Sequence, residues 1–266
     1  MPTAATNGLT LYHESEGDGP PLLCVMGLAS DSQGFAPQRA TLAGRYRVIV
    51  FDNRDAGRSS RAEVDYAVED MATDTLGLAD ALELDRFHLL GISLGSAVAQ
   101  HVALRAPDRV RTLTLAATWG RFAPAWARLR AKTWEREAVR GSREELLEEF
   151  LLLTATEPAF ESEADIAELL RLALENPYPQ ELDALIRQMR AMEHHDVLDR
   201  LAELRMPTHV LAGERDVLIP PWKGAEVVER IPDATFTLLE GTGHAMNAER
   251  ADEFNAAVLG FLDANS

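Results

Sequence analysis

The feature that most constrains the fold is the pentad Gly-Ile-Ser-Leu-Gly at residues 91–95. It ends the strand-like run RFHLLGI (86–92) and opens the helix-like stretch LGSAVAQHVALRA (94–106), which Pro107 terminates. A strand that turns directly into a helix through G-x-S-x-G needs glycines two residues from the serine to relieve crowding. The pattern therefore predicts an α/β fold with Ser93 as a nucleophile, and the alternative is an ordinary βα turn with Ser93 as an N-cap.

Strand-like and helix-like segments alternate on both sides of this turn. Apolar, β-rich runs lie at 9–14, 21–27, 46–52, 86–92, 110–117, 208–214 and 234–240. Helical patterns lie at 66–84, 94–106, 221–230 and 251–264. This alternation predicts a mostly parallel central sheet flanked by helices. The stretch 120–200 is helical in pattern throughout, so we expect one core made of 1–119 and 201–266, split by a helical insertion.

The composition narrows the partners and the chemistry. The chain has 266 residues, of which 46% are hydrophobic, and a formal net charge of −17. Such a surface repels phosphate backbones and anionic membranes, so neither nucleic acid nor membrane is an expected partner. Cys24 is the single cysteine, which excludes an internal disulfide and a cysteine-based metal site. Without a signal-peptide pattern or a membrane-length apolar run, the expected location is the cytoplasm.

A serine hydroxyl needs a neighbouring base to become a good nucleophile, and the chain has seven histidines. Four occupy predicted positions remote from Ser93 or at the wrong end of a strand, and they are His13, His88, His101 and His209. His194 and His195 lie in the insertion and remain candidates for a substrate contact. His244 follows the last predicted strand through a short loop, at the carboxyl edge of the sheet where catalytic groups gather.

The acid that would orient His244 is expected in the loop after the strand at 208–214. This loop offers Glu214 and Asp216, and Asp216 lies deeper in it, where it can turn toward His244. A carboxylate there holds the imidazole tautomer and stabilises the imidazolium. The chain order Ser93, Asp216, His244 is the order expected when the nucleophile sits on a G-x-S-x-G turn.

The segments GISLGS, AGERDVLIP and GTGHAMNAERADEFNAAVLGFL together resemble the α/β-hydrolase superfamily over essentially the whole chain. VIVFDNRDAGRSS looks like the loop after the family's fourth strand, with Asp52, Arg54, Asp55 and Arg58 as a charge network that fixes it. The chain is most similar to small bacterial hydrolases of the 3-oxoadipate enol-lactonase type, with non-haem haloperoxidase-like proteins and polyketide methylesterases as neighbours. The resemblance implies the α/β-hydrolase fold with a helical cap, and Ser-His-Asp acyl transfer without metal or organic cofactor.

The same resemblance implies an oxyanion hole made by the backbone N–H groups of Leu94 and Leu28. Many relatives have His-Gly before the second donor, whereas this chain has Met26-Gly27, so a thioether replaces a polar ring. Apolar and aromatic side chains near the serine or in the insertion are the candidates for the substrate pocket. They are Met26, Trp119, Phe122, Trp126, Met189, Met192 and His195.

These features predict a serine hydrolase of small carboxylic esters or lactones. Hydrolysis of a C–C bond in a vinylogous diketone and perhydrolase or haloperoxidase-like activity are the alternatives within the enzyme class. A small-molecule receptor on a hydrolase scaffold is the alternative from another class. Acidic residues outnumber basic ones in the insertion, so an anionic substrate would need Arg121, Arg128, Arg187 or Arg190. The physiological substrate and homo-oligomer formation are left open.

Overall fold

The computed structural model describes residues 2–160 and 162–266 and contains an eight-stranded sheet. The strand order is β1-β2-β4-β3-β5-β6-β7-β8. Strands β3 to β8 run parallel, and the β1–β2 and β2–β4 pairs are antiparallel. The strands are β1 Thr3–Thr6, β2 Leu9–Glu16, β3 Pro21–Val25, β4 Arg47–Phe51, β5 Phe87–Ile92, β6 Val110–Ala116, β7 Thr208–Gly213 and β8 Ala234–Leu239. The predicted mostly parallel sheet is therefore confirmed.

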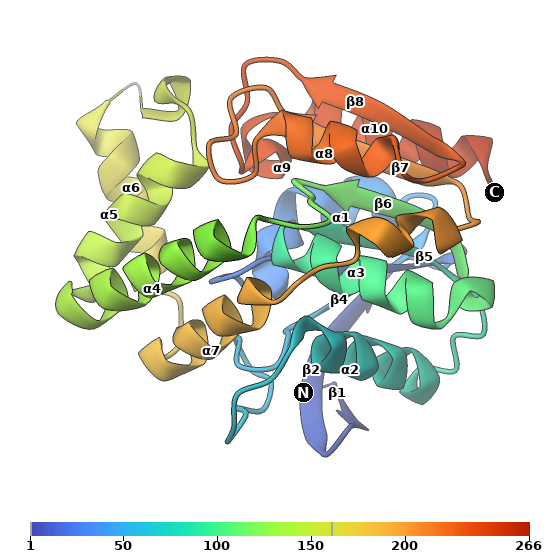
Figure 1. The fold of residues 1–266 in the computed structure, drawn as a ribbon, viewed down its shortest axis with the longest axis horizontal. Helices are drawn as coiled ribbons and strands as arrows, with labels where there is room; N and C mark the ends of the chain where they lie inside the picture. The colour runs from blue at the N-terminus through green and yellow to red at the C-terminus, as the bar shows by residue number, and fades with distance from the viewer. Residues whose placement is uncertain (1, 161) are drawn as a thin grey trace.

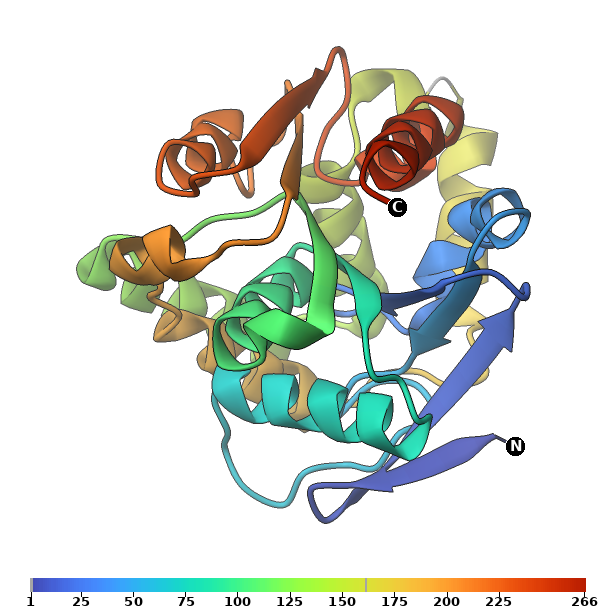
Figure 2. The same cartoon turned by 90° about the vertical axis from the view of Figure 1, so that its right-hand side faces the viewer.

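Helices cover both faces of the sheet, as the strand–helix alternation predicts (Figure 2). One face carries α2 (Val68–Ala81), α3 (Leu94–Arg105) and α8 (Pro221–Val228). The other carries α1 (Ala36–Ala43) and α10 (Ala251–Ala264), which pack against each other, with the short α9 (Met246–Glu249) beside them. In Figure 1 the helices of the 120–200 segment stand together at the left, and they are α4 Pro124–Arg140, α5 Arg143–Thr154, α6 Glu163–Leu174 and α7 Leu182–Glu193.

Burial follows the sequence pattern closely at the centre of the sheet. Every residue of β5 and the run from Leu94 to Ala103 in α3 is buried. The small side chains of α3 allow this helix to lie directly on β5 and β6. Cys24 is fully buried in β3, and desolvation by burial raises the pKa of its thiol. The core thus fixes the β5–α3 junction, and with it Ser93, more rigidly than a surface turn would.

The helical segment 120–200 is tied to the loop after β4 by a buried ion pair. Asp55, in the loop after β4, accepts hydrogen bonds from Nε and Nη2 of Arg187 on α7, both at 2.9 Å. The Asp55 side chain is fully buried. Its backbone carbonyl also accepts a bond from Gln180, and the Arg54 carbonyl accepts one from Gln188. Asp55 therefore attaches the helical segment 120–200 to the loop after β4.

Replacing Asp55 with asparagine is expected to lower the free energy of unfolding by about 3 kcal/mol or more, because the Arg187 guanidinium loses its buried counter-charge. Asparagine tolerates the positive φ of 65° at this position, so the backbone is not the cause. Urea unfolding measures the loss. Asp183→Asn is the matched control, because Asp183 pairs with the same Arg187 at the surface and should cost about 1 kcal/mol or less. Equal losses in the two variants would contradict the account.

Candidate active site

Ser93 sits on a sharply strained turn between β5 and α3. Its φ of 54° and ψ of −122° are values that non-glycine residues rarely adopt. A Cβ on Gly91 would lie 2.3 Å from the Gly95 carbonyl oxygen, and one on Gly95 would lie 2.0 Å from the Val25 carbonyl oxygen. Glycine is therefore required at both positions by close backbone approach. The turn projects Ser93 at the carboxyl end of β5, as predicted for a G-x-S-x-G elbow.

Asp216 and His244 meet at the same edge of the sheet. The Nδ1 atom of His244, after β8, lies 2.8 Å from Oδ2 of Asp216, after β7. Both side chains are buried, and Oδ1 of Asp216 accepts bonds from the backbone amides of Leu218 and Ile219 at 2.8 Å each. The carboxylate is thus held in one orientation toward the imidazole. The other candidate acid, Glu214, is exposed and accepts a bond from the Gly241 amide instead.

Ser93 and His244 line one cavity of about 150 Å³. Its walls come from the carboxyl ends of the strands on one side and from α4, α5 and α7 on the other. The lining residues are Met26, Gly27, Leu28, Ser30, Ile92, Ser93, Trp119, Arg130, Trp134, Phe150, Thr154, Met192, Leu218, His244, Ala245 and Asn247. A carboxylate on Nδ1 of an imidazole leaves Nε2 to accept the proton of a hydroxyl, so this arrangement can perform acyl transfer.

Two backbone amides flank Ser93 without a protein acceptor in the part of the chain that the structure describes, and they belong to Leu28 and Leu94. Leu28 lines the cavity next to Gly27, where an added Cβ would lie 3.1 Å from the Ser93 Cβ. Leu94 is the first residue of α3, so its N–H has no partner within the helix. Leu28 and Leu94 therefore each keep a backbone N–H without a protein acceptor on a segment next to Ser93.

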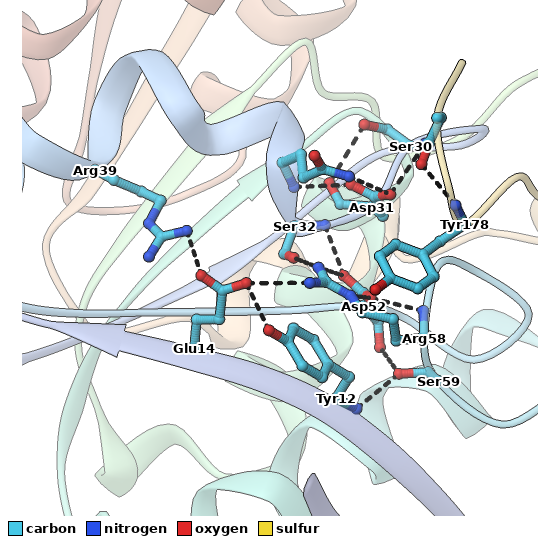
Figure 3. A network of polar contacts seen from close by, with 12 residues as sticks. Tyr12, Glu14, Ser30, Asp31, Ser32, Arg39, Asp52, Arg58, Ser59 and Tyr178 are labelled. Atoms are coloured by element: carbon cyan, nitrogen blue, oxygen red, sulfur yellow. Dashed lines mark hydrogen bonds and ion pairs between the residues drawn. The ribbon is translucent and has the colours of Figure 1, made fainter. Parts of the chain in front are cut away.

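A polar network fixes the loop after β3 (Figure 3). Asp52 accepts hydrogen bonds from the Ser32 amide at 2.8 Å, and from the amide and Nε of Arg58 at 2.8 and 3.0 Å. Asn53 donates to the Met26 carbonyl oxygen at 2.9 Å. Of the four residues expected to form one charge network, Asp52 and Arg58 pair with each other, whereas Arg54 pairs with Asp74 and Asp55 with Arg187. The bonds of Asp52 and Asn53 hold both ends of the loop after β3. Since the loop lines the cavity, this network positions its backbone amides.

The structure separates the seven predicted pocket residues into three groups. Met26, Trp119 and Met192 line the cavity that contains Ser93. Phe122, Trp126 and Met189 line an adjacent cavity. It shares Trp119, Arg130, Trp134 and Met192 with the first.

His195 lines neither cavity, which corrects the expectation that it contacts substrate. It is buried against the core, where Nδ1 lies 3.2 Å from Nε2 of His101 and Nε2 lies 3.1 Å from the Trp119 carbonyl oxygen. Burial, and then the neighbouring His101, lower the pKa of His195 to about 3. Its role is therefore to pack the base of the insertion as a neutral ring.

Two histidines in the strands have local partners. His88 contacts the Thr112 hydroxyl at 2.8 Å, and His209 contacts that of Thr237 at 2.9 Å. Burial lowers the pKa of each ring to about 4. These two rings are neutral core residues, as their predicted strand positions indicate.

Ten lining residues are not among the predicted site residues, and Arg130, Thr154, Leu218 and Asn247 are four of these ten. For Arg130 the sequence does hold a signal. Trp126, Arg130 and Trp134 recur every four residues in WARLRAKTW, which places an arginine between two tryptophans on one helix face. The other three have no such pattern, because their place depends on how separate segments pack.

Across residues 2–160 and 162–266, no group of three or more His, Cys, Asp or Glu side chains is arranged to hold a metal ion. No helix in these ranges is both long enough and apolar enough to cross a membrane.

Comparison with known proteins gives a consistent result. A family model described as the alpha/beta hydrolase fold matches residues 20–148. A protein from Caulobacter sp. (strain K31), assigned as the carbamate hydrolase RutD, is 31% identical over 96% of this chain and 97% of that protein. The crystal structure of the enol-lactonase from Burkholderia xenovorans LB400 has a TM-score of 0.88 at 27% identity, covering 98% of this chain and all of that one. A malate-bound thermophilic esterase from Thermogutta terrifontis has a TM-score of 0.87 at 29% identity, covering 99% and 97%.

Proposed function

The chain belongs to the α/β-hydrolase fold family, and we propose that it hydrolyses small carboxylic esters or lactones through an acyl-enzyme on Ser93. The observation that supports this most is the juxtaposition of Ser93 and His244 in one cavity, with Asp216 bonded to the far nitrogen of the imidazole. A carboxylate side chain at the position of Ser93 would instead act as the nucleophile and form an alkyl-enzyme ester. A serine implies transfer of an acyl group.

In the proposed reaction, Nε2 of His244 takes the Ser93 proton as Oγ attacks the carbonyl carbon of the substrate. The same imidazolium then protonates the leaving alcohol oxygen, and the C–O bond breaks to leave an acyl ester on Ser93. Water, deprotonated by His244, attacks this ester and releases the acid. Asp216 stays ionised throughout and stabilises the imidazolium that forms twice in each turnover.

The oxyanion of each tetrahedral intermediate would lie between the amides of Leu28 and Leu94. Both N–H groups are unpaired in the described structure, so they are preorganised for a charge that appears only during the reaction. We further propose that the segment 120–200 acts as a cap, since α4, α5 and α7 supply the wall opposite Ser93. Excluding bulk water in this way strengthens the electrostatic contribution of the two amides.

Carbamate hydrolysis is a second candidate, favoured by the relatives assigned as RutD. A carbamate carbonyl would be attacked by the same serine, so the two proposals share their residues and differ only in the substrate. The lining gives a small preference for esters, because its side chains are mostly apolar and offer few polar groups to bind the carbamate nitrogen.

Pre-steady-state hydrolysis of 4-nitrophenyl acetate, compared with 4-nitrophenyl N-methylcarbamate, tests the proposal. We expect a burst of one 4-nitrophenol per protein molecule with the ester, followed by steady turnover, because acylation of Ser93 by an activated ester outpaces deacylation. Faster steady turnover of the carbamate would favour the second candidate. Absence of both burst and turnover, with a small molecule that raises the melting temperature, would contradict an enzyme and favour the receptor.

A further inference from the structure

Among the described residues that line the Ser93 cavity, Arg130 is the one whose side chain carries a formal charge. It lies on α4, and its guanidinium carbon is 4.2 Å from the ring centroid of Trp134, 5.1 Å from that of Trp126 and 5.4 Å from that of Phe122. The three rings surround the cation with π faces, which attract it but accept none of its N–H groups in a strong hydrogen bond.

The charge of Arg130 has no carboxylate partner within 4.0 Å in the described part of the chain. Its recorded hydrogen bond runs from Nη1 to the Leu218 carbonyl oxygen at 3.0 Å, so four of its five N–H donors have no protein acceptor there. Of the four arginines that the sequence suggests for an anion, Arg128 is exposed and does not line this cavity, and the other three are already paired. Arg121, Arg187 and Arg190 each pair with two acidic side chains.

Keeping this cation in an apolar cavity costs free energy, since desolvation of a charge is repaid only by a counter-charge and hydrogen bonds. Burial lowers the pKa of Arg130 to about 10, and the nearby Asp216 opposes that shift. The group is therefore still protonated at neutral pH. No acidic side chain lines this cavity among the residues described, so an anionic group bound in it would supply a counter-charge that Arg130 lacks at contact distance.

We propose that Arg130 is a specificity residue that binds a carboxylate of the substrate, so that the enzyme prefers small esters or lactones bearing one free carboxylate. This inference rests on the proposed function and names its substrate class. The planar guanidinium fork matches a carboxylate in two parallel N–H···O bonds, which an ammonium cannot reproduce. The cavity of about 150 Å³ is of the size that accommodates a benzene-sized group, so the carboxylate and the ester must be close together in a short molecule.

A purely structural role for Arg130 makes a different prediction. The Leu218 residue that accepts its hydrogen bond also donates its amide to Asp216, so loss of Arg130 could loosen the Asp216 loop. Such loosening would slow every substrate equally. Binding of a substrate carboxylate would slow only substrates that have one. A matched pair of esters therefore distinguishes the two roles.

The substrates are monomethyl succinate, which carries one carboxylate, and dimethyl succinate, its neutral counterpart, with methanol release followed by NMR. We expect wild-type kcat/KM to be at least tenfold higher for the monoester. Arg130→Met should lower kcat/KM for the monoester by about 10²-fold, the loss typical of a charged hydrogen-bonded pair. It should lower kcat/KM for the diester by about tenfold or less. Arg130→Lys should retain part of the preference. Arg128→Met, an exposed arginine on the same helix, is the matched control and should change neither value.

Two outcomes would overturn the inference, namely no wild-type preference for the monoester, or equal losses on both esters in Arg130→Met. If Arg130→Met does not fold, the ester preference of the wild type and of Arg130→Lys still shows whether Arg130 binds a substrate carboxylate. Calorimetric binding of monomethyl succinate to Ser93→Ala protein tests the anion site without turnover, and Arg130→Lys should weaken it. Such binding without hydrolysis of any ester would refute the proposed function and leave the anion site standing. Turnover of 4-nitrophenyl acetate without binding of monomethyl succinate would refute the anion site and leave the proposed function standing.

Discussion

Replacing Ser93 with alanine is expected to lower kcat for a short ester by about 10⁶-fold, the scale seen when a serine nucleophile is removed. Without Oγ no acyl-enzyme can form, and the residual rate would come from the oxyanion donors and from substrate binding. Substrate affinity should change little, because the cavity walls remain. The measurement is steady-state hydrolysis of 4-nitrophenyl acetate, with the folded state checked by thermal unfolding.

Ser96→Ala is the matched control for Ser93→Ala. Ser96 is buried one turn into α3, and its Oγ donates to the Ser93 carbonyl oxygen at 2.6 Å rather than facing the cavity. Its loss should reduce kcat by less than about tenfold, the effect of one hydrogen bond. A comparable loss of activity in both variants would mean that the turn, and not the Ser93 hydroxyl, is what the reaction needs.

The second large effect is expected at the acid. Asp216→Asn should lower kcat by about 10⁴-fold, because an amide in place of the carboxylate favours the wrong imidazole tautomer and cannot stabilise the imidazolium. The amide can still accept the Leu218 and Ile219 N–H groups at its oxygen, so the loop geometry should survive. Steady-state hydrolysis of the same ester gives kcat.

Glu214→Gln is the control for this variant, since Glu214 lies two residues earlier in the same loop and faces solvent. It should keep kcat within about threefold of the wild type, as expected of a surface substitution. If Glu214→Gln is the more damaging change, the assignment of the acid is wrong.

The sequence predicts the sheet, the β5–α3 turn and the meeting of His244 with Asp216, because all three depend on local signals. Periodicity marks the strands, the two glycines mark the turn, and the carboxyl ends of parallel strands bring distant loops to one edge. The short elements at the periphery of the fold have weaker sequence signals. β1 has only four residues, and α1 has eight and no side-chain cap. Their stability comes from packing that no local pattern records.

The lining of the cavity could be predicted only in part, for a physical reason. An apolar helix residue faces either the cavity or the interior of the insertion, and the choice depends on how α4, α5 and α7 pack. Met192 faces the cavity containing Ser93, whereas His195, three residues later, is enclosed by the core. Arg130 is not predicted as a pocket residue, because a lone arginine on a charged helix has the pattern of a solvated residue. Its two flanking tryptophans are the clue.

The central claim is that Ser93 carries the acyl group during turnover. Acid-quenched peptide mass spectrometry after mixing with 4-nitrophenyl acetate tests it most directly, using the wild type and a His244→Gln variant in which deacylation is slowed. We expect an acetyl group on the peptide that contains Ser93 and none on the corresponding peptide of Ser93→Ala. An acetyl group on another residue, or hydrolysis without any covalent adduct, would contradict it.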